Sequence, residues 1–147
     1  MAREKKLKII AALFLILAFL GFADAAYLTA KHFLDSPVTC TLLEGCEVVT
    51  TSQYSKIFGV PVALFGLLYY FLIFILVNRY RETGSAPPLL WASRFTVFGL
   101  LASAWFLFVQ AVLLKAFCVY CLGSALTSTA LFILGLVTVH ALRADNK

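Results

Sequence analysis

The most regular feature of the sequence is a set of four long runs of apolar residues. Each has about the length that an α-helix needs to cross a bilayer, roughly 20 residues, because the hydrocarbon core is about 30 Å thick. The predicted spans lie at about residues 9–28, 60–77, 95–114 and 122–142. The first run is too long for the core of a cleaved signal peptide. The pattern predicts an all-α membrane protein, a four-transmembrane-helix bundle in which residues 1–147 form a single domain.

The connections between these runs differ in length. Residues 78–93 contain Gly84-Ser85-Ala86-Pro87-Pro88 and are expected to form a turn. Residues 29–59 form the longest segment outside the spans. In its second half, residues 47–58, apolar and polar positions mix in a way that suits a short interfacial helix capping the bundle. An ordinary polar loop is the alternative.

Composition and charge agree with a membrane protein. Of the 147 residues, 63% are hydrophobic and 13% are charged, about half the charged fraction of a soluble domain. A net charge of +5 raises nucleic acid as a partner. However, the basic residues lie beside the apolar runs, where they orient helices in a membrane. We therefore expect no nucleic acid partner.

The distribution of Lys and Arg predicts the orientation. Residues 1–8, 78–94 and 143–147 together carry nine of these side chains, whereas the other connections carry three, Lys31, Lys56 and Lys115. Segments rich in Lys and Arg stay in the cytoplasm. Both termini are therefore expected to be cytoplasmic, and residues 29–59 and 115–121 are expected on the exterior or periplasmic side.

All four cysteines fall on that exterior side, where disulfides persist. Cys40 and Cys46 lie in the long connection, and Cys118 and Cys121 form a C-x-x-C motif where the fourth span begins. Unpaired N–H groups at a helix start stabilise a thiolate, which is the nucleophile in disulfide exchange. Two such dithiols could relay electrons between a soluble dithiol protein and a quinone in the membrane.

Other interpretations of the cysteines remain. Two structural disulfides could fix the exterior connection of a four-span structural or interaction protein. A four-thiolate zinc site suits an oxidising compartment poorly, so no metal is expected. Haem attachment would need a histidine after Cys121, where the sequence has Leu122. The pairing also stays open, because a bond between Cys46 and Cys118 is as compatible with the sequence as two local disulfides.

A family resemblance rests on an ordered set of motifs that extends from about Leu7 to Leu142. The set consists of Cys40-x5-Cys46, Ser52, Phe58-Gly59-Val60-Pro61 and Cys118-x-x-Cys121 at the start of the last span. Together with the four spans, it resembles the vitamin K epoxide reductase family, most closely its stand-alone prokaryotic members. The implied location is therefore a prokaryotic cytoplasmic membrane.

The resemblance implies a bundle around a quinone of the ubiquinone or menaquinone type. It implies that Cys121 exchanges electrons with the quinone and that Cys118 exchanges with Cys46. Cys40 would form a mixed disulfide with a thioredoxin-fold partner, and Ser52 would hydrogen-bond a quinone carbonyl. Because no thioredoxin-like segment follows the fourth span, the partner is expected to be a separate chain.

The expected function is therefore that of a membrane thiol:quinone oxidoreductase that supports disulfide-bond formation. A dedicated quinone or quinone-epoxide reductase is the alternative. Ala125 stands where animal members have a tyrosine, so epoxide reduction is not carried over.

Asp24, the one acid within a predicted span, has either a structural hydrogen bond or a proton role, with Asp35, Glu44 and Glu47 as alternative donors. Gln110 is expected to pack within the bundle.

Overall fold

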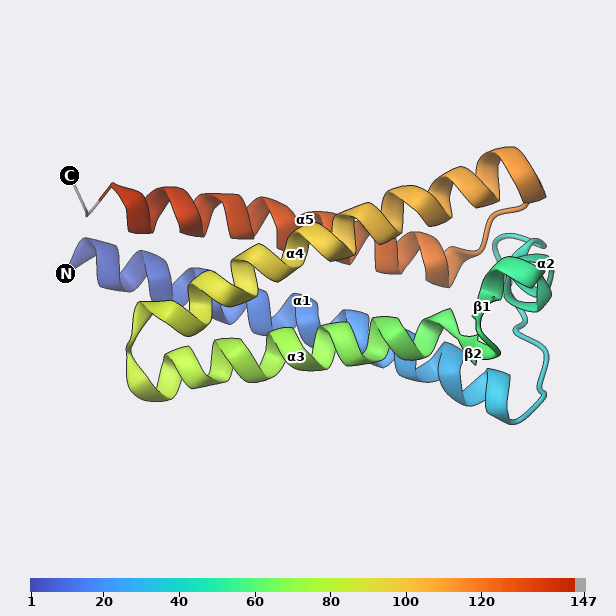
Figure 1. Cartoon of the computed structure of the whole chain (residues 1–147), viewed down its shortest axis with the longest axis horizontal. Helices are drawn as coiled ribbons and strands as arrows, with labels where there is room; N and C mark the ends of the chain where they lie inside the picture. Colours follow the sequence, from blue (N-terminus) through green and yellow to red (C-terminus); the bar gives the residue numbers. More distant parts are fainter. Residues whose placement is uncertain (145–147) are drawn as a thin grey trace.

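The computed structural model describes residues 1–144 and consists of four long helices with a short cap at one end (Figure 1). The long helices are α1 (Ala2–Phe33), α3 (Val62–Thr83), α4 (Ala86–Phe108) and α5 (Val119–Arg143). Each is long and apolar enough to cross a membrane. The predicted fold class, an all-α four-helix membrane bundle, is confirmed.

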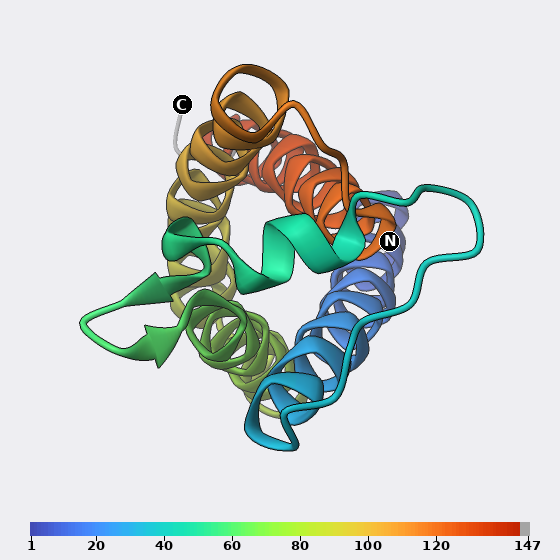
Figure 2. The ribbon, with the colours of Figure 1, turned by 90° about the vertical axis from the view of Figure 1, so that its right-hand side faces the viewer.

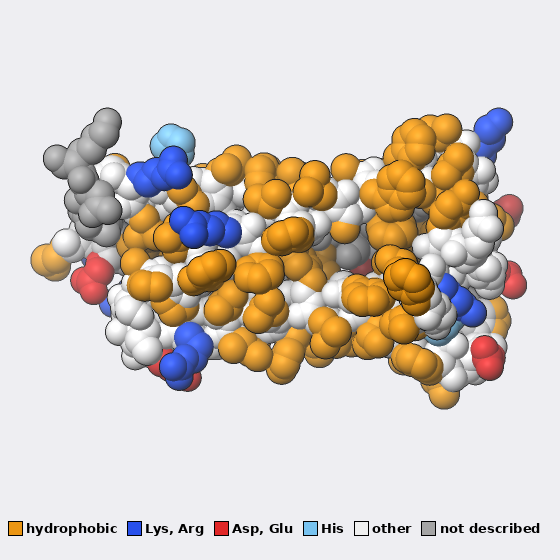
Figure 3. All heavy atoms as spheres, in the orientation of Figure 1, with side chains coloured by type: hydrophobic (Ala, Val, Ile, Leu, Met, Phe, Trp, Pro, Cys, Tyr) orange, Lys and Arg blue, Asp and Glu red, His pale blue; other side chains and the backbone are white. Residues whose placement is uncertain are grey.

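The four helices form a closed ring. Helix α1 packs against α3 and α5, and α4 packs against the same two helices from the other side (Figure 2). The start of α1 and the end of α5 lie at one end of the bundle, and α2 lies at the other (Figure 1). Apolar side chains cover the middle of the bundle, while charged side chains gather towards its two ends (Figure 3). This is the surface that a bilayer requires.

Small residues let the helices approach closely, as is typical of membrane bundles. The ring of Tyr70 occupies the position that a Cβ on Gly21 would need, and Tyr69 fills the same position beside Gly99. Buried apolar side chains complete the contacts along the bundle. They include Phe14, Ile73, Leu89 and Leu131.

The expected turn over residues 78–93 is wrong in extent. Helix α3 continues to Thr83, and α4 begins at Ala86. Gly84, whose φ is +65°, ends α3 in the left-handed conformation that glycine adopts readily. Pro87 and Pro88 then lie in the first turn of α4, where a missing backbone N–H breaks no helical hydrogen bond. The prolines therefore start a helix instead of interrupting one.

The segment that joins α1 to α3 contains the short helix α2 (Cys46–Thr51), the 3-10 helix η1 (Gln53–Ser55) and a hairpin of β1 (Lys56–Ile57) with β2 (Val60–Pro61). Phe58 and Gly59 both have positive φ, as in the tight turns that join two antiparallel strands. Helix α2 lies across the open end of the ring (Figure 2). A short capping helix is therefore present, but the predicted range of residues 47–58 is too long. The helix ends at Thr51, and residues 56–57 belong to the hairpin instead.

Candidate redox site

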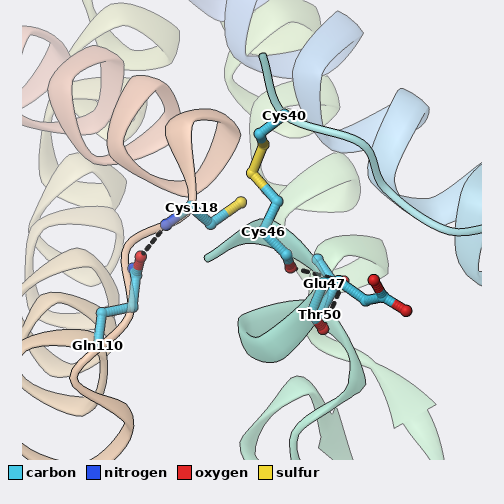
Figure 4. Close-up of a disulfide and its surroundings, with 6 residues drawn as sticks. All are labelled: Cys40, Cys46, Glu47, Thr50, Gln110 and Cys118. Carbon is cyan, nitrogen blue, oxygen red and sulfur yellow. Dashed lines mark hydrogen bonds between the residues drawn. A yellow bond between two sulfur atoms is a disulfide. The ribbon is translucent and has the colours of Figure 1, made fainter. Parts of the chain in front are cut away.

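Three of the four sulfurs converge at the start of α2. Cys40 and Cys46 form a disulfide, with their Cα atoms 5.9 Å apart, so the structure has the local pairing. The Sγ atoms of Cys40, Cys46 and Cys118 all lie within 4.8 Å of one another, and the Cys118 side chain points towards the disulfide (Figure 4). A free thiol beside a disulfide is the arrangement from which thiol–disulfide exchange starts.

The surroundings of this sulfur cluster, defined as Cys40, Cys46 and Cys118, are apolar. Cys46 and Cys118 are 1% and 0% exposed and pack with Val38 and Val49. Cys40 is only partly buried. A protein in the aqueous phase therefore has access to the disulfide from the side of Cys40.

Gly45 allows the disulfide to approach Cys118. A Cβ at this position would lie 2.6 Å from the carbonyl oxygen of Phe117 and 2.7 Å from its nitrogen, distances that real Cβ atoms do not tolerate. The start of α2 therefore rests directly on the backbone next to Cys118. The Thr50 hydroxyl also donates a hydrogen bond of 2.8 Å to the Cys46 carbonyl and so ties Cys46 into α2 (Figure 4).

Gln110 holds Cys118 from the other side. The backbone N–H of Cys118 donates a hydrogen bond of 2.9 Å to Gln110 Oε1 (Figure 4), and Gln110 is 1% exposed. Gln110 lies in η2 (Val109–Leu114), a π-helical end of the third span, and such segments often occur at functional sites. Sequence reasoning missed this contact, although a buried amide in an apolar span must find a hydrogen-bond partner.

Cys118 is the residue from which α5 starts, and its thiol is acidic. A hydrogen bond from the Cys121 side chain is the main reason why the pKa of Cys118 is lowered to about 7. Burial opposes this shift, backbone groups of Cys121 and Tyr120 at the start of the helix add to it, and the charge of Asp24 weakly opposes it. When Cys121 is reduced, Cys118 is therefore deprotonated more readily than an ordinary thiol.

Next to the sulfur cluster lies a cavity of about 690 Å³ that is lined by all four long helices and by the segment that joins α1 to α3. Its volume falls within the range of small-molecule sites, about 300–1,000 Å³. Of the four cysteines in the described chain, Cys121 is the one that lines it. The walls include large apolar side chains that suit an aromatic ligand, among them Phe65, Phe98 and Phe106. Ala125 also lines the cavity.

Ser52 lies on the wall of the cavity. Its hydroxyl donates a hydrogen bond of 2.8 Å to the carbonyl of Val49, and its own carbonyl accepts one of 2.7 Å from the Ser55 hydroxyl. The residue therefore joins α2 to η1. Its oxygen lone pairs remain available to a donor, but its proton is in use in this state.

Polar groups on α3 and α5 form the inner end of the cavity. The Tyr70 hydroxyl lies 2.9–3.0 Å from the hydroxyls of Ser124, Thr127 and Ser128, and this network joins the two helices. Two other polar atoms on the cavity walls lie outside this hydrogen-bond network. Within residues 1–144, Asp24 Oδ2 and Tyr69 Oη are buried side-chain oxygens without a hydrogen-bond partner.

Comparison with known proteins matches residues 12–136 to the vitamin K epoxide reductase family. The chain is also similar to the thiol-disulfide oxidoreductase LTO1 of Arabidopsis thaliana, with 35% identity over 125 residues, or 79% of this chain and 33% of that protein. It thus spans about a third of the length of this curated relative. Because the family match covers most of the sequence, including all four cysteines, the chain belongs to the vitamin K epoxide reductase family.

Proposed function

We propose that this membrane oxidoreductase takes electrons from the dithiol of a thioredoxin-fold partner and passes them through its two cysteine pairs to a quinone. One observation carries the proposal. Cys118 lies within exchange range of the Cys40–Cys46 disulfide, and its neighbour Cys121 lines a large apolar cavity. The C-x-x-C pair therefore borders a disulfide on one side and a space for a lipid-soluble acceptor on the other.

The first step takes place at the exposed edge of the sulfur cluster. A thiolate of the partner attacks Cys40, a mixed disulfide forms, and Cys46 leaves as a thiolate. The second thiol of the partner then attacks the mixed disulfide. The partner leaves with a disulfide, and Cys40 and Cys46 hold the two electrons. The partial exposure of Cys40 and the burial of Cys46 support this order of attack.

The second step relays the electrons inwards. Cys46 attacks Cys118 of an oxidised Cys118–Cys121 pair, and Cys121 leaves. Cys40 then attacks Cys46, and Cys118 leaves as a thiolate. A leaving thiol with a low pKa departs faster, so the acidity of Cys118 favours this direction. The arrangement observed, with Cys40 bonded to Cys46 and with Cys118 and Cys121 free, corresponds to the state after the relay.

The last step reduces the quinone, of the ubiquinone or menaquinone type. When Cys118 and Cys121 form a disulfide, they release two electrons and the one proton of Cys121, because Cys118 is already a thiolate. The quinone takes up a second proton to become a quinol. The volume and apolar walls of the cavity suit a quinone ring. Ser52 could donate to a quinone carbonyl if its hydroxyl turned away from Val49.

The other functions receive less support. A structural protein has no need for a free buried thiol beside its disulfide. A thiolate metal site would require reduction of the Cys40–Cys46 bond, because disulfide sulfurs are not thiolates. No observation favours an epoxide as the substrate. For the orientation, we propose that both termini are cytoplasmic. This is supported by the Lys and Arg distribution and by the start of α1 and the end of α5, which lie at the end of the bundle opposite α2, the helix that begins at Cys46 (Figure 1).

The direct test is quinone reduction by the purified protein in lipid nanodiscs. A reduced thioredoxin-fold protein supplies electrons, and the loss of ubiquinone or menaquinone absorbance is recorded. Cys118→Ala and Cys121→Ala should each reduce the rate to the background without enzyme. If both variants retain the wild-type rate, the relay is wrong. If the sulfurs stay oxidised whatever the state of the quinone pool, the cysteines are structural.

A further inference from the structure

Asp24 and Tyr69 stand out among the polar residues of the cavity. Tyr70 has four hydrogen-bond contacts and Gln110 binds the backbone of Cys118. In contrast, Asp24 Oδ2 and Tyr69 Oη are buried without a partner in the described chain. Unpaired buried polar groups are costly, and an acid within a membrane span calls for a functional explanation. A ligand in the cavity would supply the missing partner for both.

Asp24 also lies at the inner end of a line of cavity residues on α1. Leu28, Lys31 and His32 follow it at intervals of four, seven and eight positions, which places them on one face of a helix. Asp35 continues the line just after the helix ends. All of them line the same cavity as Asp24, so the cavity connects the buried carboxyl with ionisable groups at the exterior end of the bundle.

We propose that Asp24 donates a proton to the quinone and that Tyr69 positions the quinone by a hydrogen bond to one of its oxygens. The proposal rests on the proposed function and extends it to the proton that the reaction needs. The structural alternative for Asp24 lacks support, because Oδ2 has no hydrogen-bond partner among residues 1–144. The location of Cys121 on the same cavity brings the electron donor and the proton donor to one ligand.

The step balances with Cys118 as a thiolate and Cys121 as a thiol. The Cys118–Cys121 bond forms and releases two electrons to the quinone. Cys121 gives up one proton and the Asp24 carboxyl gives up the other, so a quinol, a disulfide and an Asp24 carboxylate result. The carboxylate then regains a proton from water through the cavity, past Lys31, His32 and Asp35. This proton replaces the one that Cys118 released earlier.

The test separates quinone reduction from the cysteine relay. Protein reduced at Cys118 and Cys121 is mixed with ubiquinone in a stopped-flow instrument, and quinol formation is followed in a single turnover. Asp24→Asn should slow this step by about 100-fold or more, the usual contribution of a positioned acid. Tyr69→Phe should raise the quinone concentration needed for half-maximal rate by about tenfold, the effect of one lost hydrogen bond. It should leave the maximal rate nearly unchanged.

Two controls distinguish a proton role from a structural one. Glu4→Gln removes an exposed carboxylate in the first turn of α1 that does not line the cavity and should retain the wild-type rate. In Asp24→Ala, added formate should restore part of the rate, because a small acid can enter the space that the side chain vacated. A purely structural defect would not respond to formate. Asp24→Glu keeps the carboxyl and should be faster than Asp24→Asn even if both fold less well.

The outcomes are distinct. A wild-type protein that does not reduce quinone contradicts the proposed function itself. A wild-type protein that does so, together with an Asp24→Asn variant of equal rate, contradicts only the role of Asp24. A slow variant that neither formate nor glutamate improves assigns Asp24 to structure and overturns the proposal. Equal quinone dependence in wild type and Tyr69→Phe removes Tyr69 from the site.

Discussion

The sulfur cluster and the cavity lie side by side, yet they are built in opposite ways. The cluster is packed so closely that a single Cβ on Gly45 would disturb it, and Cys46 and Cys118 are almost fully buried. The cavity has about 690 Å³ of space, and two buried polar atoms on its walls have no hydrogen-bond partner in the part of the chain that the structure describes. Disulfide exchange needs three sulfurs in a defined geometry, whereas a quinone needs room.

The C-x-x-C motif joins these two regions. Cys118 precedes α5 and faces the disulfide, while Cys121 lies within the first turn of α5 and faces the cavity. Residues three apart on a helix lie close enough to interact, so the two sulfurs can bond to each other. We infer that the separation keeps the quinone away from the outer disulfide, since electrons can then leave only through Cys121.

The largest effect is expected from a variant that stops thiol–disulfide exchange in the sulfur cluster. Cys46→Ala leaves Cys40 without its partner, so a thioredoxin-fold protein attached to Cys40 cannot be released by Cys46. Turnover should stop, and a stable mixed disulfide through Cys40 should accumulate. Non-reducing electrophoresis and mass spectrometry of the linked peptides will identify the sulfur. A crosslink through Cys121 instead would reverse the assignment of the two pairs.

The second prediction widens the cluster without removing a sulfur. Gly45→Ala should push α2 away from the Phe117 backbone and slow electron transfer between the pairs by about 10- to 100-fold, since a displacement near 1 Å can cost that much. Quinone reduction by protein already reduced at Cys118 and Cys121 should be unchanged.

Gly123→Ala provides the matched control, because a Cβ there meets nothing within 4 Å. Equal transfer rates in the Gly45 and Gly123 variants would show that close packing at Gly45 does not limit the relay.

The third prediction concerns the residue that touches both regions. Gln110 lines the cavity and accepts the N–H of Cys118. Gln110→Leu should destabilise the protein by about 1–3 kcal/mol, the cost of leaving a buried N–H unpaired, and should slow the relay severalfold through misplacement of Cys118. Thermal unfolding and single-turnover exchange measure the two effects. Gln110→Glu retains an acceptor and should lose less of the relay rate than Gln110→Leu; an equal loss would argue against this hydrogen bond.

The smallest expected effect is a shift in the pH at which the Cys118 thiol titrates. The pKa of Cys118 is lowered to about 7 mainly by the Cys121 side chain, so the thiolate fraction falls as the pH drops below 7. Alkylation of Cys118 in the reduced protein should slow about tenfold per pH unit below that point. In Cys121→Ala the profile should move towards higher pH, because the stabilising hydrogen bond is gone. An unchanged profile would show that the helix start alone sets the acidity.

Much of this architecture could be read from the sequence. Four apolar runs require four spanning helices because the bilayer sets their length. The residues at which the helices begin and end are harder to predict from the sequence. Charged residues such as Arg79 and Arg94 lie inside α3 and α4, and hydropathy cannot distinguish a polar helix end from a loop. The prolines after Gly84 indicated a turn, although they are equally suited to the first turn of a helix.

The sequence by itself determined the membrane class, the order of the cysteines and the helix start at the C-x-x-C motif. These depend on local pattern, bilayer thickness and the resemblance to known relatives. Only the tertiary structure decided that Cys40 is bonded to Cys46, that Cys118 lies against this disulfide while Cys121 faces the cavity, and that Gln110 holds the Cys118 backbone. Among the described residues, the structure likewise left Asp24 Oδ2 and Tyr69 Oη without hydrogen-bond partners. These features arise where segments distant in the chain pack together, and no local pattern records such contacts.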